Sequence, residues 1–226
     1  MKQVPISKTR DPFINTPVTC AGHDPETGQE RYWCSTWNEN IGALGALVCA
    51  DGTSRVYRFE RDDSSGCAKC GFYSAVLADE DTLWLCVDLA QVFRLTLSTG
   101  EIRGFLTGQP SRLLGPGMVY DPATRKLFLG TFLPPRIVAL SFDTVTGETV
   151  HIYDGVNEAT NWMGSFANED GTYTFSYEDQ VHQMSILMRW DPVKETLTER
   201  VRIPQIQTPS GLPRDAAARC FLPGAG

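Results

Sequence analysis

Short apolar segments, each long enough for one β-strand, recur along the chain and are separated by polar turns. The clearest stretch is residues 72–107, in which three turns separate four apolar runs, YSAVLA, TLWLCV, QVFRLTL and EIRGFL. Each run is rich in Val, Leu, Phe, Tyr or Trp, which favour strands. The turns carry the Asp, Ser and Gly that tight turns use. This pattern predicts four antiparallel strands in one sheet.

The same four-strand unit occurs four times. The second strands align as RYWCSTW (31–37), TLWLCVD (82–88), KLFLGTF (126–132) and TYTFSYE (172–178), with Trp33, Trp84, Phe128 and Thr174 at matching positions. The third strands align on Leu47-Val48-Cys49, Phe93-Arg94-Leu95, Val138-Ala139-Leu140 and Met188-Arg189-Trp190. The units recur roughly every 44 to 51 residues, which is the period of one propeller blade. The sequence therefore predicts an all-β protein, a β-propeller built from four-stranded antiparallel blades.

Turns between the first and second strands strengthen this prediction. They read DPETG (24–28), ADEDT (78–82), DPATRK (121–126) and NEDG (168–171). Asp or Asn opens such a turn because its side chain can bond the backbone two residues on, and Pro fits the next position because its φ is preset. A β-sandwich is the alternative, but sandwiches do not repeat matched turn chemistry at every fourth strand.

The predicted organisation is an N-terminal arm over 1–16, four blades over 17–204, and the start of a further blade or a C-terminal tail over 205–226. The blades cover about 17–60, 72–107, 116–154 and 161–204. Three arrangements fit: part of a larger seven- or eight-bladed ring that is cut short, a closed four-bladed ring, or a mixed fifth blade made by 205–226 and 1–16. We favour the first, because an open arc leaves sheet edges that a complete ring avoids.

Composition narrows the classes of partner. The 226 residues carry a net charge of −7 with no cluster of Lys or Arg, so a nucleic-acid partner is not expected. No apolar run approaches the length of a membrane span, so no membrane partner is expected either. The N-terminus has no signal-peptide apolar region, which predicts a cytoplasmic location. The odd count of 7 cysteines, with three inside strand runs, favours a reducing compartment.

Three segments carry a family resemblance: DPETG (24–28), DPATRKLFLGTF (121–132) and FDTVTGE (142–148). They resemble the broad group of propellers with DPxTG-type turns, which includes virginiamycin-lyase-like, gluconolactonase-like and quinoprotein-like repeat proteins. The resemblance covers about 17–204 and implies a fold but no activity. Trp190-Asp191 stands where WD-repeat proteins carry their dipeptide, but the other three units lack it. We therefore reject that assignment, and no kelch double glycine is present.

Two sets of residues have ligand or acid–base chemistry. Cys67 and Cys70, with Cys20 and His23, have the ligand types for zinc, but strand and loop positions separate the two pairs, so we predict no metal site. His182 lies in YEDQVHQ beside Glu178 and Asp179. With Glu178 or Asp88 it could act as a general base or bind a divalent cation. The alternative is a solvated loop without a special role. No other cofactor is expected.

Propeller ligands usually bind where the connections between blades and the loops between second and third strands converge. In this chain those segments supply a set of aromatic, amide and charged residues: Trp37, Asn38, Glu39, Tyr73, Arg112, Arg136, Asn161, Trp162 and Tyr177. Aromatic faces with a few aimed hydrogen-bonding groups suit a small polar or carbohydrate-like ligand, and such a face can also bind a protein partner.

Two functions therefore remain open. The first is a propeller that binds a ligand or a partner at this loop face. The second is a lyase- or lactonase-type enzyme that uses His182 with Glu178 or Asp88. Propellers serve both classes, so the fold cannot decide between them. Convergence of His182, Asp88 and Glu39 at the channel mouth would favour the enzyme.

Overall fold

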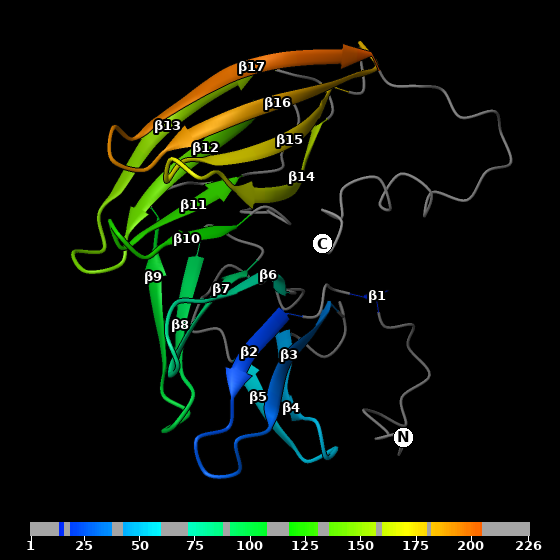
Figure 1. Ribbon diagram of the computed structural model, residues 1–226, viewed down its shortest axis with the longest axis vertical. Coiled ribbons are helices and arrows are strands. Elements are labelled where there is room, and N and C mark those ends of the chain that lie inside the picture. Colours follow the sequence, from blue (N-terminus) through cyan, green and yellow to red (C-terminus); the bar gives the residue numbers. More distant parts are fainter. Residues whose placement is uncertain are drawn as a thin grey trace, which may run out of the picture.

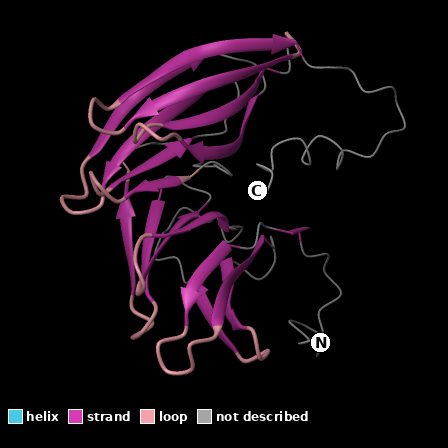
Figure 2. Ribbon diagram, in the orientation of Figure 1, coloured by secondary structure: helices cyan, strands magenta, loops and turns pink. Residues whose placement is uncertain are grey.

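A computed structural model of the chain describes residues 14–15, 19–37, 43–59, 72–87, 91–107, 118–130, 136–156, 160–179 and 182–204 (Figures 1 and 2). These residues form strands and turns and contain no helix. None of the described segments is therefore a helix that could cross a membrane.

The strands form four antiparallel sheets, and within each sheet strands that follow one another in sequence are hydrogen-bonded neighbours. Blade one contains β2 (Thr19–His23), β3 (Glu30–Trp37), β4 (Ala43–Cys49) and β5 (Ser54–Phe59). Blade two contains β6 (Phe72–Leu77), β7 (Thr82–Val87), β8 (Gln91–Thr96) and β9 (Ile102–Leu106). Blade three contains β10 (Val119–Asp121), β11 (Lys126–Gly130), β12 (Arg136–Asp143) and β13 (Thr149–Val156). Blade four contains β14 (Thr160–Ala167), β15 (Tyr173–Asp179), β16 (Met184–Asp191) and β17 (Thr196–Pro204).

One short strand lies outside this pattern. β1 (Ile14–Asn15) pairs with the end of β3, where Ile14 is opposite Trp37. The prediction of four-stranded antiparallel units is confirmed. The four sheets follow one another along an open arc, with blade one at the bottom of Figure 1 and blade four at the top.

A buried apolar core fills each of the three junctions between successive blades. The aligned second-strand residues Trp33, Trp84 and Phe128 each point at the next blade and are at most 2 % exposed. The following blade receives them with apolar residues of its own second strand, such as Leu83 at the first junction and Phe175 at the third. Burial of these rings is the main stabilisation that holds blade to blade.

Most of the described turns, those between first and second and between third and fourth strands, gather at one end of the blades, which we call the turn end, drawn in pink in Figure 2. Asp24 accepts hydrogen bonds from the Thr27 N–H at 2.9 Å and from its hydroxyl at 3.0 Å. Asp121 accepts in the same way from Thr124, at 2.8 Å and 2.5 Å. The predicted turn chemistry is therefore present, because these carboxylates satisfy backbone N–H groups that the strands leave unpaired. At the opposite end of each blade, called the loop end, the second and fourth strands end and the first and third strands begin.

A hydrogen bond crosses the junction between blades three and four. The Tyr173 hydroxyl donates to the Asp121 carboxylate at 2.9 Å. Burial, and next this hydrogen bond to the carboxylate, raise the pKa of Tyr173 well above its ordinary value of 10.0. The folded protein thus disfavours the ionised phenolate.

This shift predicts a stability loss in alkali. The contribution of Tyr173 is complete below the phenol pKa of the unfolded chain, near 10, and is lost as the pH rises above it. We expect the melting temperature to fall as the pH rises above about 10, and to fall less steeply in Tyr173→Phe. Thermal melts followed by circular dichroism at each pH test this, and an equal slope in the two proteins would contradict it.

Candidate functional site

Most of the predicted ligand-binding residues that the structure describes lie at the loop end. Trp37 is the last residue of β3, Tyr73 the second of β6, and Arg136 the first of β12. In an antiparallel blade, the first and third strands begin where the second and fourth strands end. The positions of these residues on their strands therefore bring three blades' contributions to the same end of the arc.

Blade four contributes two directly paired sets of predicted residues. Asn161 of β14 is opposite Glu178 of β15, and Trp162 is opposite Tyr177. Residues that face each other on antiparallel strands share one side of the sheet. The register therefore places an aromatic pair and, one position along both strands, an amide–carboxylate pair at the loop end of blade four.

His182 follows these pairs closely. It is exposed and lies in the turn that joins β15 to β16, four residues after Glu178. Of the proposed acid–base set, the structure places His182 and Glu178 at the loop end of blade four. Asp88 lies outside the described residues, as do the predicted ligand-binding residues Asn38, Glu39 and Arg112.

The residues with metal-binding chemistry are only partly described. Cys20 and His23 both lie on β2, where Cys20 is opposite Tyr32 and His23 is opposite Glu30. Cys67 and Cys70 lie outside the described residues. Across the segments that the structure describes, no group of three or more His, Cys, Asp or Glu side chains is arranged to hold a metal ion.

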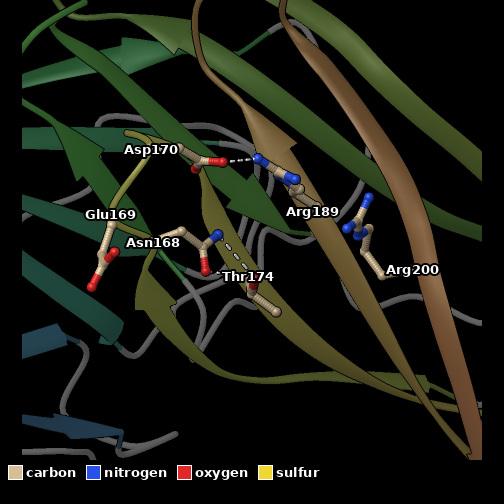
Figure 3. Close-up of a pocket in the computed structure, with 6 residues that line it drawn as sticks. All are labelled: Asn168, Glu169, Asp170, Thr174, Arg189 and Arg200. Atoms are coloured by element: carbon tan, nitrogen blue, oxygen red, sulfur yellow. Dashed lines mark hydrogen bonds and ion pairs between the residues drawn. The ribbon is translucent and has the colours of Figure 1, made fainter.

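A hollow at the turn end of blade four was not predicted from the sequence. It has a volume of about 360 Å³, is open to solvent, and lies on the side of the sheet that faces away from blade three (Figure 3). Its lining is polar and charged: Asn168, Glu169, Asp170, Thr174, Arg189 and Arg200.

Hydrogen bonds fix most of this lining. Arg189 forms an ion pair with Asp170 (Figure 3). It also donates from Nε to the Thr172 hydroxyl at 2.9 Å. Asn168 donates from Nδ2 to the Thr174 hydroxyl at 3.1 Å. The Thr172 hydroxyl, and less strongly Arg189, lower the pKa of Asp170 below its ordinary value, so this carboxylate stays ionised at neutral pH.

Arg200 differs from its neighbours in the hollow. Within the described part of the chain it makes no hydrogen bond and no ion pair, and it is exposed on β17. The sequence held one signal for this region: Thr174 occupies the position at which the three other blades carry Trp33, Trp84 and Phe128. That position faces the next blade, so the fourth blade carries a polar group there in place of an aromatic ring.

No protein-family model and no curated protein matches the sequence. Solved structures of low sequence identity do match its fold. An auxiliary nutrient binding protein from Bacteroides thetaiotaomicron is 12% identical with a TM-score of 0.53, and the match covers 84% of this chain and 43% of that one. The Dos1 propeller is also 12% identical with a TM-score of 0.53, and 84% and 47% of the two chains are covered. The fold is a β-propeller.

A protein from Lactobacillus plantarum is similar as well, at 16% identity and a TM-score of 0.51, over 76% of this chain and 54% of that one. At such identities the likeness concerns the fold of the propeller and not its ligand or activity. The chain spans between 43% and 54% of the length of these three structures.

Proposed function

We propose that this propeller binds a ligand or a protein partner at its loop end, and that the ligand is a small polar molecule of carbohydrate-like chemistry. The observation that carries the proposal is the strand register of blade four, which sets Trp162 opposite Tyr177 and Asn161 opposite Glu178. Aromatic rings stack on the apolar faces of sugar rings, while amide and carboxylate groups bond their hydroxyls.

Residues of the other three blades also support the loop end as the binding surface. Trp37, Tyr73 and Arg136 come from blades one, two and three and lie at their loop ends. A ligand there would meet residues of several blades, as expected for a site at the mouth of a propeller channel. The net charge of −7 and the absence of a basic cluster argue against a nucleic acid in this position.

Isothermal titration with three neutral disaccharides, maltose, cellobiose and lactose, tests the proposal. Trp162→Ala and Tyr177→Ala are each expected to weaken binding about tenfold, which corresponds to about 1.4 kcal/mol. Phe166→Ala is the matched control, since Phe166 lies on the same strand at the turn end and is 56% exposed. It is expected to leave affinity unchanged.

Three outcomes would count against this function. Binding of none of the sugars would remove the carbohydrate class, and an equal loss in Phe166→Ala would remove the loop end as the site. Hydrolysis or elimination of a lactone or uronide probe by the wild type but not by His182→Ala would instead support the lyase- or lactonase-type enzyme, with His182 as general base.

A further inference from the structure

The two end faces of the arc differ from the faces inside the junctions. We call the side of blade four that points away from blade three its outer face. By register it carries Thr174, Arg189 and Thr198 near the turn end, followed toward the loop end by Ser176, Leu187, Val201 and Ile203. Val201 is 43% exposed and Ile203 45% exposed. Apolar side chains of the kind that the inner junctions bury are thus exposed to solvent on this face.

Blade one has an outer face of its own, on the side opposite Trp33. It carries Tyr32, Cys34, Ala46, Val48 and Val56, as the register of β3, β4 and β5 shows. Val56 is 63% exposed, while Tyr57 beside it is buried in the first junction. Each end of the arc therefore offers a sheet face with an apolar middle.

The polar contacts at the turn end of the first junction share one pattern. A cation of the preceding blade reaches an oxygen in a turn of the following blade. Arg31 donates to the Glu80 carbonyl at 3.0 Å, and Arg55 donates to the Thr99 carbonyl at 3.4 Å. The donors belong to blade one and the acceptors to turns of blade two.

The third junction has the same pattern, but the acceptor in the turn is a carboxylate instead of a carbonyl oxygen. Lys126 of blade three pairs with Glu195, which lies in the turn between β16 and β17, at 2.8 Å. Ser141 of blade three donates to the same carboxylate at 3.0 Å. A junction of this protein thus combines a buried apolar middle with a cation-to-turn contact at the turn end.

Each outer face carries one side of such a junction, with cations on blade four and acidic turns on blade one. Blade four, as the preceding partner, offers Arg200, which pairs with no residue that the structure describes, beside Arg189, which is held by Asp170. Blade one, as the following partner, offers turns with Asp24, Glu26 and Asp51, all at its turn end. Complementary charge at the turn end and apolar side chains in the middle are arranged in the same order on both faces.

We propose that the outer face of blade four binds the outer face of blade one in a second copy of the chain. Two arcs then join head to tail through two equivalent junctions and form one closed ring of eight blades. A contact between two different faces closes a ring only when the rotations of the copies return to the start, so the proposed ring requires each arc with its junction to span half a turn. The inference rests on the blade faces and stands independently of the ligand proposed for the loop end.

Pairing of identical faces is less favourable. When turn end meets turn end, two outer faces of blade four would bring Arg200 against Arg200, and two outer faces of blade one would bring acidic turns together. The head-to-tail arrangement instead sets Arg200 against the acidic turns of blade one at both junctions, while Arg189 is already paired with Asp170. It also covers Val56 of one copy and Val201 of the other.

Light scattering coupled to size exclusion tests the ring with the full chain. The wild type is expected to have twice the 25.0 kDa mass of one chain. Arg200→Glu, on blade four, and Val56→Glu, on blade one, are each expected to weaken association at least tenfold. Val145→Glu is the control, because Val145 is 59% exposed in a turn of blade three and lies on neither outer face. Unchanged near-ultraviolet circular dichroism would show that the variants fold.

Mixing the two variants distinguishes the contact type. Arg200→Glu keeps an intact blade-one face and Val56→Glu keeps an intact blade-four face. The mixture is therefore expected to form two-copy particles through one junction, at concentrations where neither variant does so alone. A monomeric wild type, a ladder of masses above two copies, or association that survives in Val56→Glu but not in Arg200→Glu would overturn the proposal.

Discussion

Trp33→Ala is expected to lower the free energy of unfolding by about 3–5 kcal/mol, the largest effect of any substitution proposed for this chain. Trp33 is 0% exposed in the core between blades one and two, and its ring centroid lies 5.8 Å from that of Tyr57. Truncation would remove the ring from both blades and leave a cavity that backbone on two sheets cannot close. Guanidinium unfolding measures the loss.

Gly45 provides a control within the same contact. A Cβ at position 45 would lie 2.0 Å from a Trp33 ring carbon, so Gly45→Ala forces the ring to move and is expected to cost about 1–3 kcal/mol. The double variant Trp33→Leu/Gly45→Ala should lose less unfolding free energy than the two single variants together, because the smaller leucine side chain leaves room for the methyl group of the alanine. Strict additivity would show that the two positions do not share this contact.

Asp121→Ala is the second substitution with a large expected effect, a loss of about 3 kcal/mol in the free energy of unfolding. Asp121 is 4% exposed and accepts hydrogen bonds from Thr124 and, across the junction, from Tyr173. Its removal leaves the Tyr173 hydroxyl without this acceptor and breaks the turn as well. Urea unfolding is the appropriate measurement.

Asp143→Ala separates these two losses. Asp143 caps its turn as Asp121 does, with bonds from the N–H groups of Val145 and Thr146 at 2.8 and 2.9 Å, but it is the last residue of β12 and these bonds stay within its own turn. It is expected to cost about 1 kcal/mol. Equal losses in the two alanine variants would mean that the bond to Tyr173 contributes nothing to the junction.

The repeat could be predicted from the sequence because its signals are local. Strand length, β-branched and aromatic content, and an Asp or Asn at the start of each turn are properties of a few neighbouring residues. Trp33, Trp84 and Phe128, which the alignment placed at matching positions, all face the next blade, since a matching place in a repeat implies a matching side of the sheet. The fold class followed from these two signals.

Strand register was harder to predict. The sequence alignment centred the third strand of blade three on Ala139, but Phe128 is opposite Ser141. Apolar triplets do not fix register, because a strand can slide by two residues and keep the same side buried. Gly22, with a φ of 72°, lies within a bulge of β2 that no local signal announced.

The two candidate sites differ in the same way, since one follows from local sequence and the other depends on strand register. The loop-end positions of Trp162, Tyr177 and Glu178 follow from the strand bounds, so the sequence could place them. The hollow beside Arg189 and Arg200 could not be found in this way, because its lining joins β15, β16 and β17 with the turn before β15. Only the register of three strands brings those side chains together.

Glu195 has a left-handed backbone, with a φ of 52°, at the turn position that Gly100 and Gly147 occupy in blades two and three. A residue with a Cβ pays about 1–2 kcal/mol for this conformation, and here its carboxylate offsets that cost through Lys126 and Ser141. The blades are therefore not interchangeable modules. A glycine turn transplanted from blade two would remove the backbone strain in blade four, but it would also remove the Glu195 contacts to blade three. A shuffled or duplicated blade would therefore lack the side chain that its new neighbour requires.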